Sequence, residues 1–191
     1  MRYAARLFAA IAFLLAGART LADDGSHVSL VPWKVIEPGA ATGTPLTLFW
    51  VPASVDELRR SDLLTSEELT LFSSRCVAMR VVRFDDLDRL TALGIDAIPA
   101  AVLIDGEGGV IGSVDPRNGS LVVSEVVALV RNELEERESA ANARLDEARR
   151  AAEAQGVDEA IAIYRSVWEQ RCVCPRQGRD ARRAMKKIAR R

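Results

Sequence analysis

The chain has 191 residues, of which 49% are hydrophobic and 28% are charged, a composition typical of a globular protein. It excludes a disordered chain, which is poorer in apolar residues, and a multi-span membrane protein, which is poorer in charge. The formal net charge of −1 gives no chain-wide excess of positive charge, so we expect no nucleic-acid partner. His27 is the single histidine, which argues against metal and catalytic sites that need several imidazoles.

The N-terminus has the pattern of a secretory signal peptide. Two arginines precede an apolar run over residues 7–18, which is too short to span a bilayer as a helix. Candidate cleavage sites follow Ala18 and Ala22, and no cysteine follows that could carry a lipid anchor. We therefore expect residues 1–22 to be a signal peptide and the mature chain to be exported, periplasmic or secreted, without a membrane span. An uncleaved amphipathic anchor is the alternative.

Seven regular elements are predicted between residues 46 and 138, after an irregular or short-strand segment at 23–44. In chain order they are a strand at 46–50, helical structure at 55–74, a strand at 76–84, a helix at 86–93, strands at 100–104 and 110–114, and a helix at 121–138. The order β-α-β-α-β-β-α predicts an α/β fold.

Two capping boxes divide the first helical stretch. Ser54 with Glu57, and Thr65 with Glu68, each place a hydroxyl and a carboxylate where they can bond exposed amides at a helix start. We therefore expect residues 55–74 to form two helices or one kinked helix.

The segment around Pro99 resembles the thioredoxin family. Residues 94–108 read G-I-D-A-I-P-A-A-V-L-I-D-G-E-G, similar to the segment of that family in which the proline follows a cis peptide bond. The Phe49-Trp50 strand end resembles the other half of the family's signature. The resemblance covers residues 44–137, and it implies a thioredoxin-like core with a cis bond between Ile98 and Pro99.

The redox motif of that family is missing. In a thioredoxin, a Cys-x-x-Cys motif follows this strand at a helix start, where the helix dipole stabilises a thiolate. The two possible alignments place Ser54 and Glu57, or Val51 and Ser54, at the cysteine positions. Neither pair can carry a two-electron thiol couple, so we expect no catalytic residues there and no cofactor.

The resemblance also implies a binding groove between the first helix and the cis-proline loop. The family holds extended peptides there, and in this chain the groove would be lined by Trp50, Pro52, Ser54, Ile98 and Pro99. Peptide backbone pairs with the residue before such a proline as an added strand. We therefore expect a non-catalytic module of the cell envelope that binds a protein or an extended peptide, or acts as a scaffold.

Three cysteines lie outside the missing motif. Cys76 begins a predicted strand at the end of the sheet opposite Pro99, and Cys172 and Cys174 lie near the C-terminus. In an exported chain, two interpretations are compatible with the sequence: Cys76 is a buried residue of the core, or any two of the three cysteines form a disulfide. The Cys172-Val173-Cys174 pair also allows an atypical thiol-disulfide oxidoreductase, which is the alternative function. The cysteine spacing matches no usual zinc site, so we expect no metal.

The region beyond residue 138 predicts a helical extension. A helix at 140–155 stops near Gly156, and the following Glu159-Ala160-Ile161 and Tyr164 resemble one tetratricopeptide-type hairpin. A last helix at 178–190 has an apolar stripe opposite a basic face.

Charge is unevenly distributed between this extension and the rest of the chain. Residues 176–191 carry a formal charge of +7, whereas residues 23–175 carry about −11. The basic face predicts either a solvated helix surface or a patch that binds a partner or an anion. We divide the chain into the signal peptide, a thioredoxin-like domain at 23–138 and the helical extension at 139–191.

Overall fold

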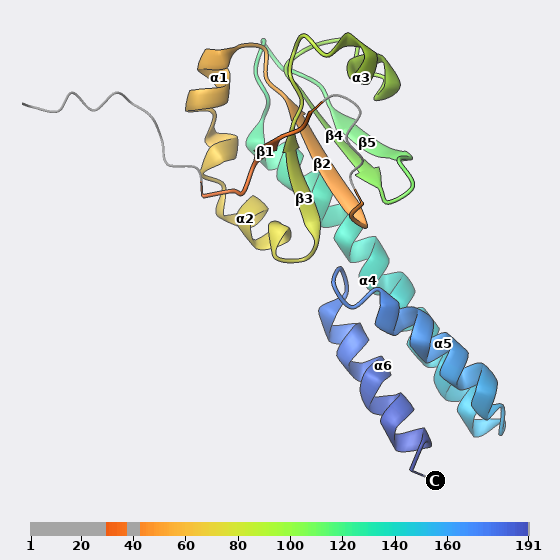
Figure 1. Ribbon diagram of the computed structural model, residues 1–191. Helices are drawn as coiled ribbons and strands as arrows, with labels where there is room; N and C mark the ends of the chain where they lie inside the picture. The colour runs from red at the N-terminus through yellow and green to blue at the C-terminus, as the bar shows by residue number, and fades with distance from the viewer. Residues whose placement is uncertain (1–29, 38–42, 191) are drawn as a thin grey trace, which may run out of the picture.

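The computed structural model describes residues 30–37 and 43–190, and the predicted signal peptide and His27 lie outside the described residues. The described part is an α/β body with a helical region that projects from one end of it (Figure 1). Its elements are β1 (Lys34–Val35), β2 (Leu46–Val51), α1 (Val55–Arg60), a 3₁₀ turn η1 (Asp62–Leu64), α2 (Glu67–Ser73), β3 (Val77–Val81), α3 (Leu87–Ala92), β4 (Ala100–Asp105), β5 (Val110–Val114), α4 (Val123–Glu153), α5 (Val157–Glu169) and α6 (Pro175–Ile188).

The strands form one mixed sheet in the order β1-β3-β2-β4-β5. β1 and β2 run parallel to β3, whereas β4 is antiparallel to β2 and β5 is antiparallel to β4. This mixed sheet with helices is compatible with the expected thioredoxin-like core.

The strand register defines two ends of the sheet. At one end β2 and β3 finish and β4 begins, because Trp50 pairs with Val81 and Val51 pairs with Ala100. We call it the Pro99 end. At the other, the Cys76 end, β2 and β3 begin and β4 finishes. Cys76 and Pro99 therefore lie at opposite ends of the sheet, as predicted.

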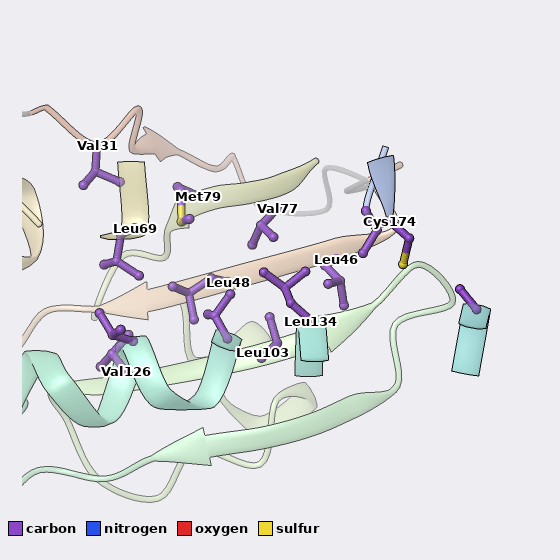
Figure 2. Close-up of a cluster of buried hydrophobic side chains, with 14 of the residues drawn as sticks. Val31, Leu46, Leu48, Leu69, Val77, Met79, Leu103, Val126, Leu134 and Cys174 are labelled. Carbon is purple, nitrogen blue, oxygen red and sulfur yellow. The ribbon is translucent and has the colours of Figure 1, made fainter. Parts of the chain in front are cut away.

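Side-chain alternation along β2 builds a core on each face of the sheet. Leu46, Leu48 and Trp50 are buried on the face covered by α2 and the first half of α4. Figure 2 shows Leu46 and Leu48 beside Leu134 of α4 in this layer. Phe49 and Val51 point to the other face and pack in a second, smaller cluster that includes residues of α3. Both faces are apolar, which explains why the strand reads as a continuous hydrophobic run.

α4 joins the sheet to the helical region without a break. This 31-residue helix covers the sheet with its first half and carries α5 and α6 on its second half (Figure 1). No glycine or proline lies between Val123 and Glu153, so nothing in the sequence stops the helix at residue 138. The domain boundary placed after residue 138 stays a prediction and falls inside this helix.

The two predicted capping boxes have different outcomes. In the first, the predicted bond to the hydroxyl is confirmed, because Ser54 Oγ accepts a hydrogen bond from the Glu57 N–H over 3.2 Å. The second is wrong: Ser66, not Thr65, is the N-cap of α2, and its hydroxyl accepts from the Leu69 N–H. Thr65 instead closes the preceding 3₁₀ turn with a backbone bond to Asp62, so the second helix starts one residue later.

Candidate functional site

The Pro99 end carries the loops that the sequence selected as a binding groove. α1 begins there after β2, the loop into α3 follows β3, and residues 94–99 lead into β4 (Figure 1). The peptide bond between Ile98 and Pro99 is cis, as expected. Of the five groove residues, Ser54 and Ile98 are exposed, whereas Trp50, Pro52 and Pro99 are buried.

Ser54 occupies the start of α1, where a redox protein of the thioredoxin type would need sulfur. Its hydroxyl is used as the helix cap, and Val51, the other candidate position, is buried in β2. The Ala53 N–H donates to Glu57 Oε2 over 2.6 Å, so the carboxylate completes the cap from the other side. The chemistry of this helix start is therefore structural.

Trp50 supports the Pro99 end from beneath. Its ring is fully buried and meets Trp33 edge to face, with 5.4 Å between the ring centroids. The Trp33 indole N–H donates to the Leu63 carbonyl, which attaches the N-terminal segment to the turn after α1. Among the described residues the Trp50 indole N–H makes no hydrogen bond of normal geometry.

Glu57 is the titratable group most affected by this packing. Burial raises the pKa of its carboxyl above the usual value for glutamate. The bond from the Ala53 N–H and the nearby Trp50 indole N–H lower the pKa and offset only part of that rise. A half-buried carboxyl with a raised pKa thus lies in the first turn of α1, close to the exposed Ser54.

Ile98 presents both side chain and backbone at this end. Its side chain is 37% exposed. Among the described residues, neither its N–H nor its carbonyl makes a hydrogen bond, because the pairing of β4 with β2 begins at Ala100. Unpaired backbone groups beside an exposed apolar side chain are what an added strand needs from a protein surface. Sequence reasoning selected Ile98 but had no means of knowing that its backbone is unpaired.

Further exposed apolar side chains surround this loop region. Val55 lies in the first turn of α1, Phe84 lies between β3 and α3, and Leu87 is the first residue of α3. No motif in the sequence marked these side chains as site residues. They could have been identified because they follow two strands that end at the same edge of the sheet. Asp85, whose pKa is lowered by its bond to Arg83, forms an exposed ion pair with that arginine in the loop after β3.

The cysteines lie at the Cys76 end and in the adjacent helical region. Cys76 and Cys172 form a disulfide, with 5.7 Å between their Cα atoms and a separation of 96 positions in the sequence. Cys174 is a free, buried thiol whose pKa is raised, chiefly by burial. The Cys172-Val173-Cys174 segment therefore does not form a pair of its own here.

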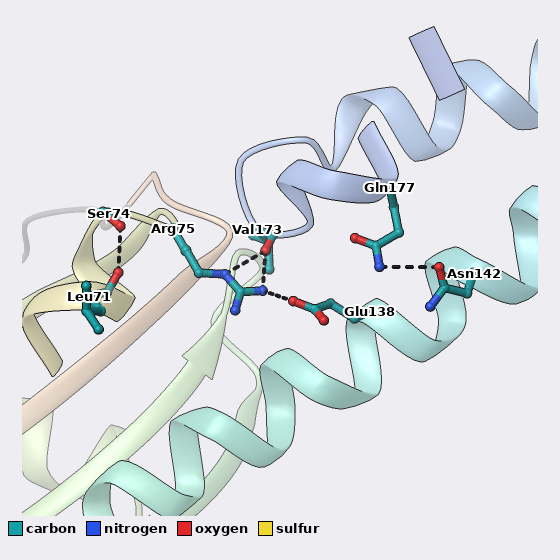
Figure 3. A network of polar contacts seen from close by, with 7 residues as sticks. All are labelled: Leu71, Ser74, Arg75, Glu138, Asn142, Val173 and Gln177. Atoms are coloured by element: carbon teal, nitrogen blue, oxygen red, sulfur yellow. Dashed lines mark hydrogen bonds and ion pairs between the residues drawn. The ribbon is translucent and has the colours of Figure 1, made fainter. Parts of the chain in front are cut away.

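Arg75 links the same regions and was missed by sequence reasoning. Its Nε and Nη2 atoms donate to the Val173 carbonyl over 3.2 and 2.8 Å, and Nη2 also pairs with Glu138 of α4 (Figure 3). One side chain from the α2–β3 turn thus holds both α4 and the turn before α6. No local pattern marks such a residue, because its partners lie 63 and 98 positions away.

Two classes of feature are missing from the described residues. In residues 30–37 and 43–190, no three histidine, cysteine or acidic side chains are placed to hold a metal ion. No helix in the described part of the chain combines the length and apolarity needed to cross a membrane.

No protein-family model matches this chain. A comparison with curated proteins likewise finds no match. The function is therefore inferred from the residues and their geometry.

Proposed function

We propose that this chain is an exported thioredoxin-like protein that binds extended polypeptide at the Pro99 end without catalysing thiol-disulfide exchange. The strand order, the parallel and antiparallel pairings and the helices on both faces support that fold. The apolar N-terminal run supports export to the periplasm or beyond the cell.

The observation that carries the binding function is the state of Ile98. An exposed apolar side chain lies next to backbone groups that have no partner among the described residues. Extended polypeptide would pair its own backbone with Ile98, while its apolar side chains would cover Ile98 and the nearby Val55. Pro99 holds the adjoining backbone without adding a competing N–H donor.

The placement of the cysteines argues against a thiol-disulfide oxidoreductase. No cysteine stands at the start of α1, Cys172 is bonded to Cys76, and Cys174 is buried with a raised pKa. A buried thiol with a raised pKa forms little of the thiolate that attacks disulfides. These features argue against the alternative, an oxidoreductase that uses the Cys172-Val173-Cys174 pair.

A polypeptide kept unfolded by carboxymethylation of its cysteines, such as carboxymethylated lactalbumin, tests the binding function. We expect the full chain to bind it, with an affinity that Ile98→Asp lowers about tenfold or more, because a charge replaces an apolar contact. Fluorescence anisotropy of the labelled polypeptide measures the dissociation constant.

Leu71→Asp is the matched control. Leu71 is 65% exposed on α2, which leads to the Cys76 end of the sheet, so this variant adds the same charge away from the proposed site. It should bind like the unmodified chain. Equal loss of affinity in both variants, or no binding by the unmodified chain, would refute the proposal.

A further inference from the structure

The exposed face of α6 is the most strongly charged surface in the C-terminal region. Seven basic side chains in and just after this helix are exposed: Arg176, Arg179, Arg182, Arg183, Lys186, Lys187 and Arg190. Asp180 is the single acidic residue within the helix, and it lies 3.7 Å from Arg183 in an exposed ion pair. The face therefore keeps a large net positive charge.

The opposite face of α6 fixes which way these cations point. Gly178 and Ala181 are buried, and a Cβ atom at Gly178 would approach Arg171 Cβ to 2.5 Å. Gln177 is buried as well and donates through Nε2 to Asn142 of α4 over 3.3 Å (Figure 3). Because α6 cannot rotate without breaking these contacts, its basic face stays turned to solvent.

The charge is also separated along the length of the molecule. α6 lies in the helical region that projects beyond the Cys76 end, and its C-terminal part lies far from α1 and α3 (Figure 1). The rest of the mature chain carries a formal charge of about −11. An anionic surface would thus attract one end of the molecule and repel the remainder.

We propose that the basic face of α6 attaches the protein to anionic phospholipid bilayers. The cations follow one convex helix over about 21 Å, from residue 176 to residue 190, which suits a flat surface of headgroup phosphates. The apolar residues of α6 are packed against the other helices, so attachment is electrostatic and involves no insertion. The predicted signal peptide would carry the chain across a membrane and away from the nucleic acid of the cell, which favours lipid over nucleic acid as the source of phosphate.

Attachment through α6 would also orient the molecule on the bilayer, whether or not the chain binds peptide. With α6 on the bilayer, the acidic remainder of the chain is repelled by the same surface. The Pro99 end then faces away from the membrane.

Co-sedimentation of the full chain with phosphatidylglycerol–phosphatidylcholine vesicles tests the proposal. Replacing Arg183, Lys186, Lys187 and Arg190 by Gln should weaken binding about 100-fold or more at low salt, because each basic residue near an anionic surface contributes about fivefold. Pure phosphatidylcholine vesicles should not bind through this face, and about 0.5 M salt should release the protein from anionic vesicles.

A matched variant controls for total charge and for the N-terminal run. Replacing Arg59, Arg60, Arg150 and Arg165, all exposed, by Gln removes the same charge elsewhere and leaves the same N-terminus. It should bind nearly as the unmodified chain does. Equal affinity of the two fourfold variants would overturn the proposal. Tighter binding to duplex DNA than to anionic vesicles, or salt-sensitive self-association through the same four residues, would also overturn it.

Discussion

Ser54 occupies the place at the start of α1 where thiol chemistry would require a cysteine. Its hydroxyl accepts the Glu57 N–H and so satisfies one of the amides that a helix start leaves open. A hydroxyl cannot cycle between a dithiol and a disulfide. The residue that would carry catalysis in a redox protein therefore only caps a helix here.

The full chain should not reduce insulin disulfides above the background rate of dithiothreitol. The reason is the missing thiol at α1, together with the bridge that occupies Cys172. Turbidity of precipitating insulin chains measures the rate. Activity that survives Cys76→Ser but disappears with Cys172→Ser would contradict this prediction and restore the oxidoreductase hypothesis.

Glu57 should make the stability of the protein depend on pH. Burial raises the pKa of its carboxyl in the folded state, so the folded state binds its proton more tightly than the unfolded state does. The resulting stabilisation is present below the ordinary range of glutamate and is lost as pH rises through the raised pKa.

Glu57→Gln removes this titration and keeps an oxygen acceptor for the Ala53 N–H. The free energy of unfolding of the unmodified chain, relative to that of the variant, should therefore fall between about pH 4 and about pH 7. Urea denaturation at both values measures it, and Glu67→Gln on exposed α2 surface serves as the control. A difference that rises with pH would show that the sign of the shift is opposite.

At the scale of elements, local chemistry could be read from the sequence and pairing could not. The predicted strand at 110–114 coincides with β5, because Asp105 organises the turn before it by accepting the Glu107 and Gly109 amides. The strand predicted at 76–84 ends at Val81, which pairs with Trp50, and β2 itself ends one residue later at Val51. Strand ends set by a neighbour are not visible in the strand's own sequence.

The candidate site shows the same division. The cap at Ser54 and the cis bond before Pro99 follow local patterns, and both are confirmed. β2 is apolar on both faces, so its sequence does not show on which face of the sheet Trp50 lies. The complete burial of Trp50 could therefore not be predicted from the local sequence. Which two of the three cysteines form a disulfide likewise depends on where the turn before α6 lies against the sheet, and the local sequence does not show this.

Arg75 connects the turn before β3 to α4 and to the turn before α6 through its side-chain hydrogen bonds. Arg75→Met keeps the side-chain stem but removes the bonds to the Val173 carbonyl and to Glu138, and it should lower the free energy of unfolding by about 1–3 kcal/mol. Glu138→Gln, which leaves the bonds to Val173 in place, should cost less. Urea denaturation of both variants measures the difference. An equal or larger loss in Glu138→Gln would contradict the assignment.

At the scale of the whole molecule, the Cys76–Cys172 bridge joins the sheet to the turn between α5 and α6. It spans 96 residues, and the chain-entropy model gives such a loop about 4–5 kcal/mol of stabilisation through the unfolded state. Cys172→Ser should therefore lower the free energy of unfolding by several kcal/mol. Cys174→Ala, which keeps the bridge, should cost less.

Alkylation in denaturant without a reductant checks the pairing directly. One label should be added, on Cys174, and three should be added after reduction. A label on Cys76 would show that the bridge is absent, and no loss of stability in Cys172→Ser would show that the bridge does not stabilise the fold.

Extended polypeptide is expected to pair its backbone with that of Ile98. Backbone amide NMR of the full chain during titration with carboxymethylated lactalbumin tests it most directly. We predict that the Ile98 amide signal shifts and that its hydrogen exchange slows, with smaller changes at Val55. An unchanged Ile98 signal, with the perturbations confined to α5 and α6, would contradict it.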